Sequence, residues 1–81
     1  MTITVKLFAA MRDLTGDDVV SVELPDGATV ADLRREMGKQ LPLARTLLGR
    51  SMIAVNHDTA DNDRVLQAAD EVAVIPPVSG G

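Results

Sequence analysis

The sequence predicts an α+β domain in which a mixed sheet of four to five strands packs on one main helix plus a short helix. Three patterns support this fold class. Two segments near the start alternate apolar and polar residues, a later segment repeats apolar residues at helical spacing, and the last apolar run is short and rich in β-branched residues. Strands combined with a single amphipathic helix favour a sheet that is covered on one face.

The first third of the chain predicts two strands. Residues 2–8 alternate, which places Phe8 on the face opposite the apolar residues, and residues 19–24 alternate in the same way. Between them, residues 10–14 predict a turn of helix closed by Gly16. Because the connection is short, we expect the two strands to pair antiparallel. The residues expected on the covered face are Ile3, Val5, Leu7, Val20, Val22 and Leu24.

A Pro-Asp-Gly turn leads into the main helix. Thr29 and Asp32 have the spacing of a capping box, in which the Thr29 hydroxyl accepts from a helical amide and the Asp32 carboxylate reaches back. The helix is expected to end at Leu41, because Pro42 disfavours helical backbone in the residue before it. Its apolar stripe consists of Val30, Leu33, Met37 and Leu41.

The second half of the chain predicts a short helix followed by further strands. The helix is expected over residues 43–48, with Gly49 as its stop. A strand is expected over residues 52–55, and a final strand starts at Asp70 and runs to Ile75. The expected connections are a turn at residues 56–58, an edge strand at residues 59–60, and an irregular stretch at residues 61–69 in which Val65 and Leu66 lie under the sheet.

This order of elements predicts the arrangement of the sheet. The first and last strands are the most apolar, so we expect them to lie centrally as parallel neighbours, with the main helix as the crossover on the covered face. That arrangement is the β-grasp fold of ubiquitin-like proteins. The main alternative is a ferredoxin-like fold, but it needs a second full helix, and residues 61–69 are a poor candidate for one.

Composition limits the class of protein. The 81 residues include no cysteine, and 46% are hydrophobic but only 1% aromatic, so we expect a single domain with an aliphatic core. The net charge of −4 argues against a nucleic-acid partner and favours a partner with a basic surface. No apolar run reaches the roughly 18 residues of a membrane span, and the start lacks the features of a signal peptide. We therefore expect a cytoplasmic protein that binds neither nucleic acid nor membrane.

Residues 76–81 read Pro-Pro-Val-Ser-Gly-Gly and follow the final strand directly. The prolines end the strand because neither offers an N–H group to a neighbouring strand. We expect a domain over residues 1–77 and a flexible tail over residues 78–81. With no Cβ, Gly80 and Gly81 fit a channel that is too narrow for other residues. Such a tail is able to carry a terminal carboxylate into a partner's active site.

The sequence contains little other chemistry. His57 lies in a predicted turn without a second metal ligand, and the nearby carboxylates lack the spacing of a calcium loop, so we expect no metal site and no bound cofactor. The domain is therefore not expected to be catalytic alone. The Gly81 carboxylate is the exception, because ATP can activate it by adenylation. A sulfur nucleophile would then give a thiocarboxylate, and an amine would give an amide.

Four segments carry a family resemblance. They are residues 8–16 (FAAMRDLTG), 30–33 (VADL), 55–56 (VN) and 70–81 (DEVAVIPPVSGG). With these segments, the chain resembles the MoaD/ThiS family of ubiquitin-like sulfur carriers over essentially its whole length. The Phe-Ala-x-x-Arg-Asp and Pro-Pro-Val-Ser-Gly-Gly patterns favour the MoaD branch, the small subunits of molybdopterin synthase.

The resemblance implies two protein partners. An E1-like adenylyltransferase (MoeB-like) would activate Gly81 with ATP, and a large synthase subunit (MoaE-like) would receive the tail in its active site. There, the thiocarboxylate would donate sulfur to cyclic pyranopterin monophosphate during molybdenum cofactor biosynthesis. The alternatives are a sulfur carrier for thiazole, tRNA or cysteine synthesis, a ubiquitin-like protein modifier, and a β-grasp adaptor with an incidental tail.

The resemblance also implies a set of site residues. Gly81 would carry the reactive group. Phe8 either packs in the core or lies on a partner-facing patch, and its position opposite the apolar face of the first strand favours the patch. Arg12 is either a solvated helix-end charge or an interface residue. Where family members often have an Asp-Gly turn before the last strand, this chain has Ala68-Ala69, so either Ala69 adopts a positive φ at a cost of about 1–2 kcal/mol or the turn differs. The residues expected to bind partners are Phe8, Arg12, Ile75, Pro76, Pro77, Val78, Ser79 and Gly80.

Overall fold

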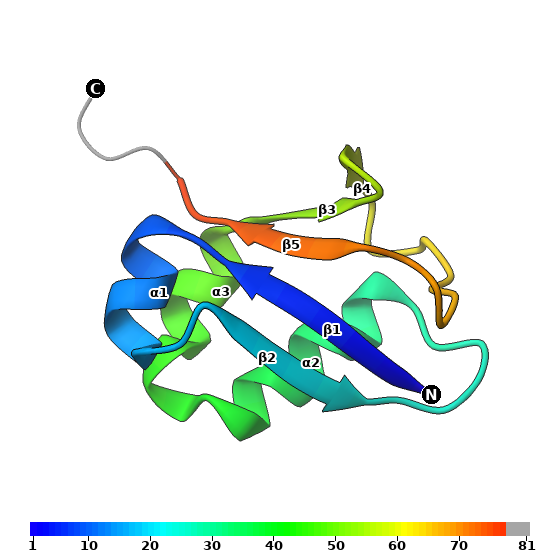
Figure 1. The fold of residues 1–81 in the computed structure, drawn as a ribbon, viewed down its shortest axis with the longest axis horizontal. Helices are drawn as coiled ribbons and strands as arrows, with labels where there is room; N and C mark the ends of the chain where they lie inside the picture. Colours follow the sequence, from blue (N-terminus) through cyan, green and yellow to red (C-terminus); the bar gives the residue numbers. More distant parts are fainter. Residues whose placement is uncertain (78–81) are drawn as a thin grey trace.

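The computed structural model describes residues 1–77, which form a mixed five-stranded sheet with helices on one face (Figure 1). The strands are β1 (Thr2–Leu7), β2 (Val19–Glu23), β3 (Met52–Val55), β4 (Asp58–Ala60) and β5 (Val72–Ile75). The helices are α1 (Ala9–Thr15), α2 (Val30–Gln40) and α3 (Arg45–Arg50), and a 3₁₀ turn, η1 (Pro42–Ala44), precedes α3. Within this part of the chain, no helix combines the length and the apolar character that crossing a membrane requires.

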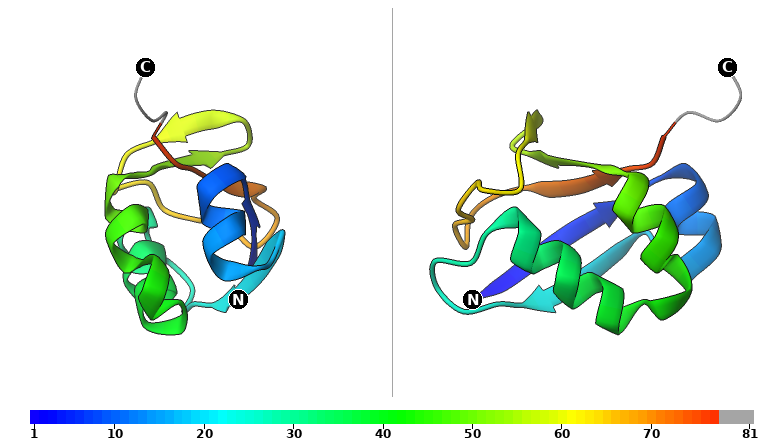
Figure 2. Two further views of the ribbon diagram at one scale, coloured as in Figure 1. Left: turned by 90° about the vertical axis from the view of Figure 1, so that its left-hand side faces the viewer. Right: turned by 180° about the vertical axis from the view of Figure 1, so that it is seen from behind.

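The strand order is β2-β1-β5-β3-β4. β1 pairs antiparallel with β2 and parallel with β5, and β3 pairs antiparallel with both β5 and β4. The helix α2 crosses the back face of the sheet, which is hidden in Figure 1 and turned toward the viewer on the right of Figure 2. The predicted β-grasp arrangement, with the first and last strands as parallel neighbours, is therefore confirmed, and the ferredoxin-like alternative is wrong.

The core lies between the sheet and the helices. All six residues expected on the covered face of the first two strands are buried, and so are the inward-facing residues of α2. Burying one such aliphatic side chain completely contributes about 1.5–3 kcal/mol. The largest fully buried side chains are Ile3, Leu7, Met11, Leu33, Met37, Ile53 and Leu66. Because the helices cover only one face, the side chains that alternate outward from β1, β3 and β5 are left on the other, open face.

The ends of α1 and α2 follow the sequence signals. Gly16 closes α1 with a φ of 79° and donates its N–H to the Arg12 carbonyl at 2.7 Å. The capping box of α2 is present: the Asp32 N–H donates to the Thr29 hydroxyl at 3.3 Å, and the Thr29 N–H donates to the Asp32 carboxylate at 2.9 Å. The hydrogen bond from the Thr29 N–H, followed by the one from the Arg35 side chain, lowers the pKa of Asp32 below its ordinary value.

Two expectations in the second half are wrong. Gly49 does not stop the short helix, which continues to Arg50 because the N–H and hydroxyl of Ser51 donate to the carbonyls of its last turn. Val65 does not lie under the sheet and is 47% exposed. Its backbone forms a bridge with the start of α2, so in this extended segment Leu66 takes the inward position and Val65 faces out.

The turn before the last strand also differs from expectation. Asp70 does not start β5, which begins at Val72. Instead, the Asp70 carboxylate accepts from the Gln67 N–H at 2.7 Å and closes the turn through Ala68 and Ala69. Neither alanine has a positive φ. The turn therefore differs from one that needs glycine, and it carries no left-handed strain at Ala69.

Candidate functional site on the open face of the sheet

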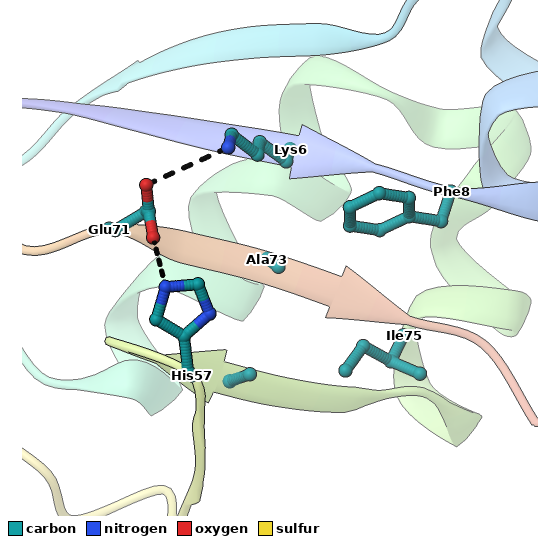
Figure 3. A pocket seen from close by; sticks show the side chains of 7 residues that line it. Lys6, Phe8, His57, Glu71, Ala73 and Ile75 are labelled. Carbon is teal, nitrogen blue, oxygen red and sulfur yellow. Dashed lines mark ion pairs between the residues drawn. The ribbon is translucent and has the colours of Figure 1, made fainter.

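The open face of the sheet carries a shallow hollow of about 270 Å³. Its side chains project from β1, β5 and the β3–β4 hairpin, on the side away from the helices (Figure 3). These strands meet because Lys6 lies opposite Ala73 in the parallel pair and Ala54 lies opposite Ala73 in the antiparallel pair. The residues that line this sheet-face hollow are Lys6, Phe8, Ala54, His57, Glu71, Ala73 and Ile75.

One end of the sheet-face hollow is apolar. Phe8 is 46% exposed and Ile75 is 45% exposed, and Met52, which is 52% exposed, lies directly opposite Ile75 in the sheet. Figure 3 shows Phe8 and Ile75 at the same end, where β5 runs on into Pro76. Large apolar side chains gathered at one place on a small domain are typical of a protein-binding surface. This one lies beside the point where the C-terminal segment leaves the sheet.

The backbone after β1 places Phe8 at this end. β1 ends at Leu7, one residue earlier than predicted, and Phe8 is the extended N-cap of α1. Its carbonyl accepts from the Met11 N–H at 3.1 Å. Ala9 has a φ of 47°, a left-handed conformation that costs a non-glycine residue about 1–2 kcal/mol. This tight turn keeps the Phe8 ring over the sheet while the chain turns away into α1.

The other end of the sheet-face hollow is charged. The two Glu71 carboxylate oxygens lie 3.6 Å from Lys6 Nζ and 2.8 Å from His57 Nε2 (Figure 3). The His57 side chain is 86% exposed, so it lies at the solvent-facing edge of the hollow. Between the two ends, Ala54 and Ala73 form a floor of small side chains. The hollow thus runs from an apolar end beside the C-terminal segment to a glutamate at the far end.

Asn56 fixes the backbone at the charged end. Its N–H donates to the Glu71 carbonyl at 2.7 Å, and its side-chain oxygen accepts from the Glu71 N–H at 2.9 Å. The side-chain amide of Asn56 also donates to the Asp70 carboxylate at 2.9 Å. The hydrogen bond from the Gln67 N–H, and to a lesser extent this one, lower the pKa of Asp70. Asn56 and His57 have φ values of 53° and 73° and form the two-residue connection between β3 and β4.

The sequence analysis did not predict the two hydrogen bonds between Asn56 and the Glu71 backbone, nor the pairing of the Glu71 side chain with Lys6 and His57. The available signal was Asn56, because asparagine tolerates the left-handed backbone of a two-residue hairpin. Asp58, which was expected in the turn, is the first residue of β4. The turn is therefore shorter than predicted, and its tightness brings His57 over Glu71.

The structure brings some of the predicted site residues together and leaves others apart. Phe8 and Ile75 line the same hollow, Pro76 is half-buried and Pro77 is exposed. Arg12 does not line the hollow but pairs with Asp18 at 3.7 Å on the exposed side of α1. The predicted residues Val78, Ser79, Gly80 and Gly81 lie outside the described residues. Among residues 1–77, no cluster of three or more acidic or histidine side chains is arranged to hold a metal ion.

Comparison with known families assigns the chain. A profile described as the ThiS family matches residues 5–81, which is nearly the whole sequence. The chain belongs to the ThiS family. The predicted resemblance is thereby confirmed, and the family's β-grasp fold is the one described above.

Relatives of this ThiS-family chain point in two functional directions. The molybdopterin synthase sulfur carrier subunit of Escherichia coli (strain K12) is 40% identical over 81 residues, which cover 98% of this chain and 99% of the relative. The putative molybdopterin converting factor, subunit 1, from Pyrococcus furiosus is 35% identical with a TM-score of 0.85, over 96% of this chain and 99% of that structure. The small archaeal modifier protein 1 of Haloferax volcanii is 26% identical with a TM-score of 0.85, over 95% and 98%.

Proposed function

We propose that this protein is the sulfur carrier subunit of a molybdopterin synthase, with Gly81 as the residue that carries the sulfur. The observation that carries the proposal is the 40% identity, over nearly the full length of both chains, to a molybdopterin synthase sulfur carrier subunit. The Gly-Gly end of the sequence and the exposed apolar end of the sheet-face hollow support it. The fold supplies a rigid body, and the reactive group belongs to the chain end.

The proposed chemistry has two steps on Gly81. A carboxylate oxygen attacks the α-phosphorus of ATP on an adenylating partner, and pyrophosphate leaves. A sulfide-equivalent nucleophile then attacks the carbonyl carbon of the adenylate, AMP leaves, and a thiocarboxylate remains. Its soft, ionised sulfur is the nucleophile that a large synthase subunit would direct at cyclic pyranopterin monophosphate. ATP is the co-substrate of the partner and needs no site on this chain.

In this proposal, the sheet-face hollow serves as the docking surface. Phe8 and Ile75 provide half-exposed apolar area beside the C-terminal segment, so a partner that covers them also lies close to Pro76 and Pro77. Aromatic side chains such as phenylalanine are enriched at protein interfaces, where a few well-buried residues supply most of the binding energy. Arg12 lies outside this hollow, where it pairs with Asp18, and its predicted role at a partner interface stays a prediction.

A second candidate function is protein modification. The likeness to a small archaeal modifier protein, with a TM-score of 0.85, favours it. The chemistry diverges only after adenylation, because an amine on a target protein would replace the sulfur nucleophile and form an amide with Gly81. Conjugates of this chain to other proteins in a cell extract, absent when Gly81 is deleted, would support modification.

Intact-mass spectrometry tests the main proposal. The protein is incubated with the adenylating enzyme of the same organism, ATP and a sulfur donor, and a variant without Gly81 serves as the control. The expected result is the mass gain that corresponds to exchange of one oxygen for sulfur, in the full-length protein only. An unchanged mass, while the enzyme converts its known carrier in a parallel reaction, would refute the proposal.

A further inference from the structure

We propose that the sheet-face hollow is a seat for an arginine side chain of the large synthase subunit, with Glu71 as the anion that pairs with it. The inference rests on the proposed function, because it concerns the partner that receives the C-terminal segment. It adds a chemical requirement on that partner. One arginine must lie with its stem along the alanine floor and its guanidinium at the charged end of the hollow.

The shape of the hollow suits a long side chain with an apolar stem. Ala73 and Ile75 on β5, and Glu71 just before it, lie on the open face at every second residue, so they are spaced by about 6.6–6.8 Å. A side chain that enters beside Ile75 therefore crosses Ala73 before it reaches Glu71. The small floor leaves room for methylene groups, and the Phe8 ring at the entrance offers an apolar surface to the stem of the side chain (Figure 3).

The contacts of Glu71 indicate which head group fits. His57 already places a planar ring nitrogen 2.8 Å from one carboxylate oxygen, while Lys6 Nζ lies 3.6 Å from the other. The pair with His57 is exposed to solvent and is therefore worth little, so a partner can replace it. A carboxylate accepts several hydrogen bonds, and Lys6 keeps its place. A guanidinium is planar like imidazole, always charged, and more weakly hydrated than an ammonium group.

The surroundings favour a cation from the partner over an anion. The chain has a net charge of −4, and hydrogen bonds from the Gln67 N–H and from Asn56 favour the charged form of the neighbouring Asp70 and lower its pKa. Asn56 bonds both the N–H and the carbonyl of Glu71, so the backbone that presents the carboxylate is fixed before binding. A preorganised anion at the end of an apolar track loses little ordering entropy when an arginine binds.

The test compares Glu71→Gln with Glu23→Gln. Both variants remove one negative charge, and Glu23 is an exposed residue of β2 that lines no part of the hollow. Affinity for the large synthase subunit of the same organism is measured by calorimetry at low and high salt. Glu71→Gln should weaken binding about tenfold and reduce its salt dependence, whereas Glu23→Gln should change affinity by less than about twofold. Equal effects of the two variants would overturn the arginine seat.

A double-mutant cycle identifies the arginine. Each surface arginine of the large subunit is changed to glutamine and titrated with the wild-type chain and with the Glu71→Gln variant. One arginine should lose its effect on affinity in the Glu71→Gln background, and lysine at that position should not restore it. Ala73→Leu, which fills the floor, should also weaken binding. If no arginine couples to Glu71, the inference is wrong.

Separate readouts distinguish this inference from the proposed function. Formation of the Gly81 thiocarboxylate and binding of the wild-type chain to the large subunit report on the function. If the wild-type chain binds and is modified but Glu71→Gln binds equally well, only the arginine seat fails. If the wild-type chain neither binds nor is modified, both fail. Melting temperatures of all variants, which should match the wild type within about 5 °C, show that the fold is intact.

Discussion

Two consecutive residues, Leu7 and Phe8, are expected to have different roles: Leu7 in the stability of the fold and Phe8 in binding a partner. Leu7 is 2% exposed in the core, and Phe8 is 46% exposed at the apolar end of the sheet-face hollow. Leu7→Ala and Phe8→Leu therefore test whether the open face is a binding surface that is independent of the core. The assays are thermal unfolding followed by circular dichroism and calorimetric titration of the large synthase subunit.

The magnitudes follow from burial. A Leu→Ala change in a core that cannot collapse costs about 2.7–5 kcal/mol. For 81 residues, total stability is about 4–12 kcal/mol, so Leu7→Ala removes a large share of it. At about 4–8 °C per kcal/mol, the melting temperature should fall by more than about 10 °C. Phe8→Leu exchanges one half-exposed apolar side chain for another and should cost less than about 1 kcal/mol.

Binding should respond in the opposite order. Loss of the aromatic ring at an interface costs about 0.5–1.5 kcal/mol beyond its area, so Phe8→Leu should weaken the complex by about twofold to tenfold. Leu7→Ala, measured well below its melting temperature, should bind like the wild type. A Phe8→Leu variant that melts as early as Leu7→Ala, or that binds with unchanged affinity, would refute the assignment of the open face.

Three further predictions concern other parts of the chain. Arg34 donates to the carbonyl of Leu48 at 2.8 Å and to the side chain of Asn62 at 2.9 Å, so Arg34→Met should lower the free energy of unfolding in urea by about 1–2 kcal/mol. Arg35 is an exposed neighbour, so Arg35→Met should have a much smaller effect, and equal effects of the two variants would contradict the prediction. The folded-state pKa values of Asp32 and Asp70 lie below their ordinary 3.8, so their contribution to stability is fully present above about pH 4 and is lost as the pH falls through the lower folded values. Changing both residues to asparagine should therefore flatten the pH dependence of the melting temperature below about pH 4. An unchanged pH dependence in this acid range would count against the prediction. Gly80→Val should leave the melting temperature unchanged, because glycine has no side chain that the core could bury, yet it should block thiocarboxylate formation in the intact-mass assay. A large loss of stability would contradict this prediction.

Local signals predicted most of the fold. The alternation of residues 2–8 and 19–24 predicted both strands and their buried faces, and the spacing of Thr29 and Asp32 predicted the cap of α2. These features depend on residues that are close in sequence, so propensity and periodicity are sufficient. The central position of the first and last strands also followed, because the most apolar strands lie at the centre of a sheet that is covered on one face.

Two predictions in the second half of the chain failed because a specific hydrogen bond or backbone bridge outweighed the general preference. Glycine is common just after a helix, but α3 continues through Gly49 because Ser51 supplies donors to its last carbonyls. The inward position in the segment before β5 depends on where the backbone bridges α2, which no short window reveals; Val65 therefore faces out and Leu66 faces in. In both cases, the partner that decides the outcome lies outside the pattern that was used.

The sequence by itself determined that this chain folds as an aliphatic-cored β-grasp domain, because alternation, helical spacing and composition are properties of the chain alone. Only the tertiary structure decided which side chains meet at the charged end of the sheet-face hollow. Lys6, His57 and Glu71 come from three distant segments, and they meet because β5 lies between β1 and β3. Side chains on neighbouring strands are brought together by strand order and register, which local sequence patterns do not specify.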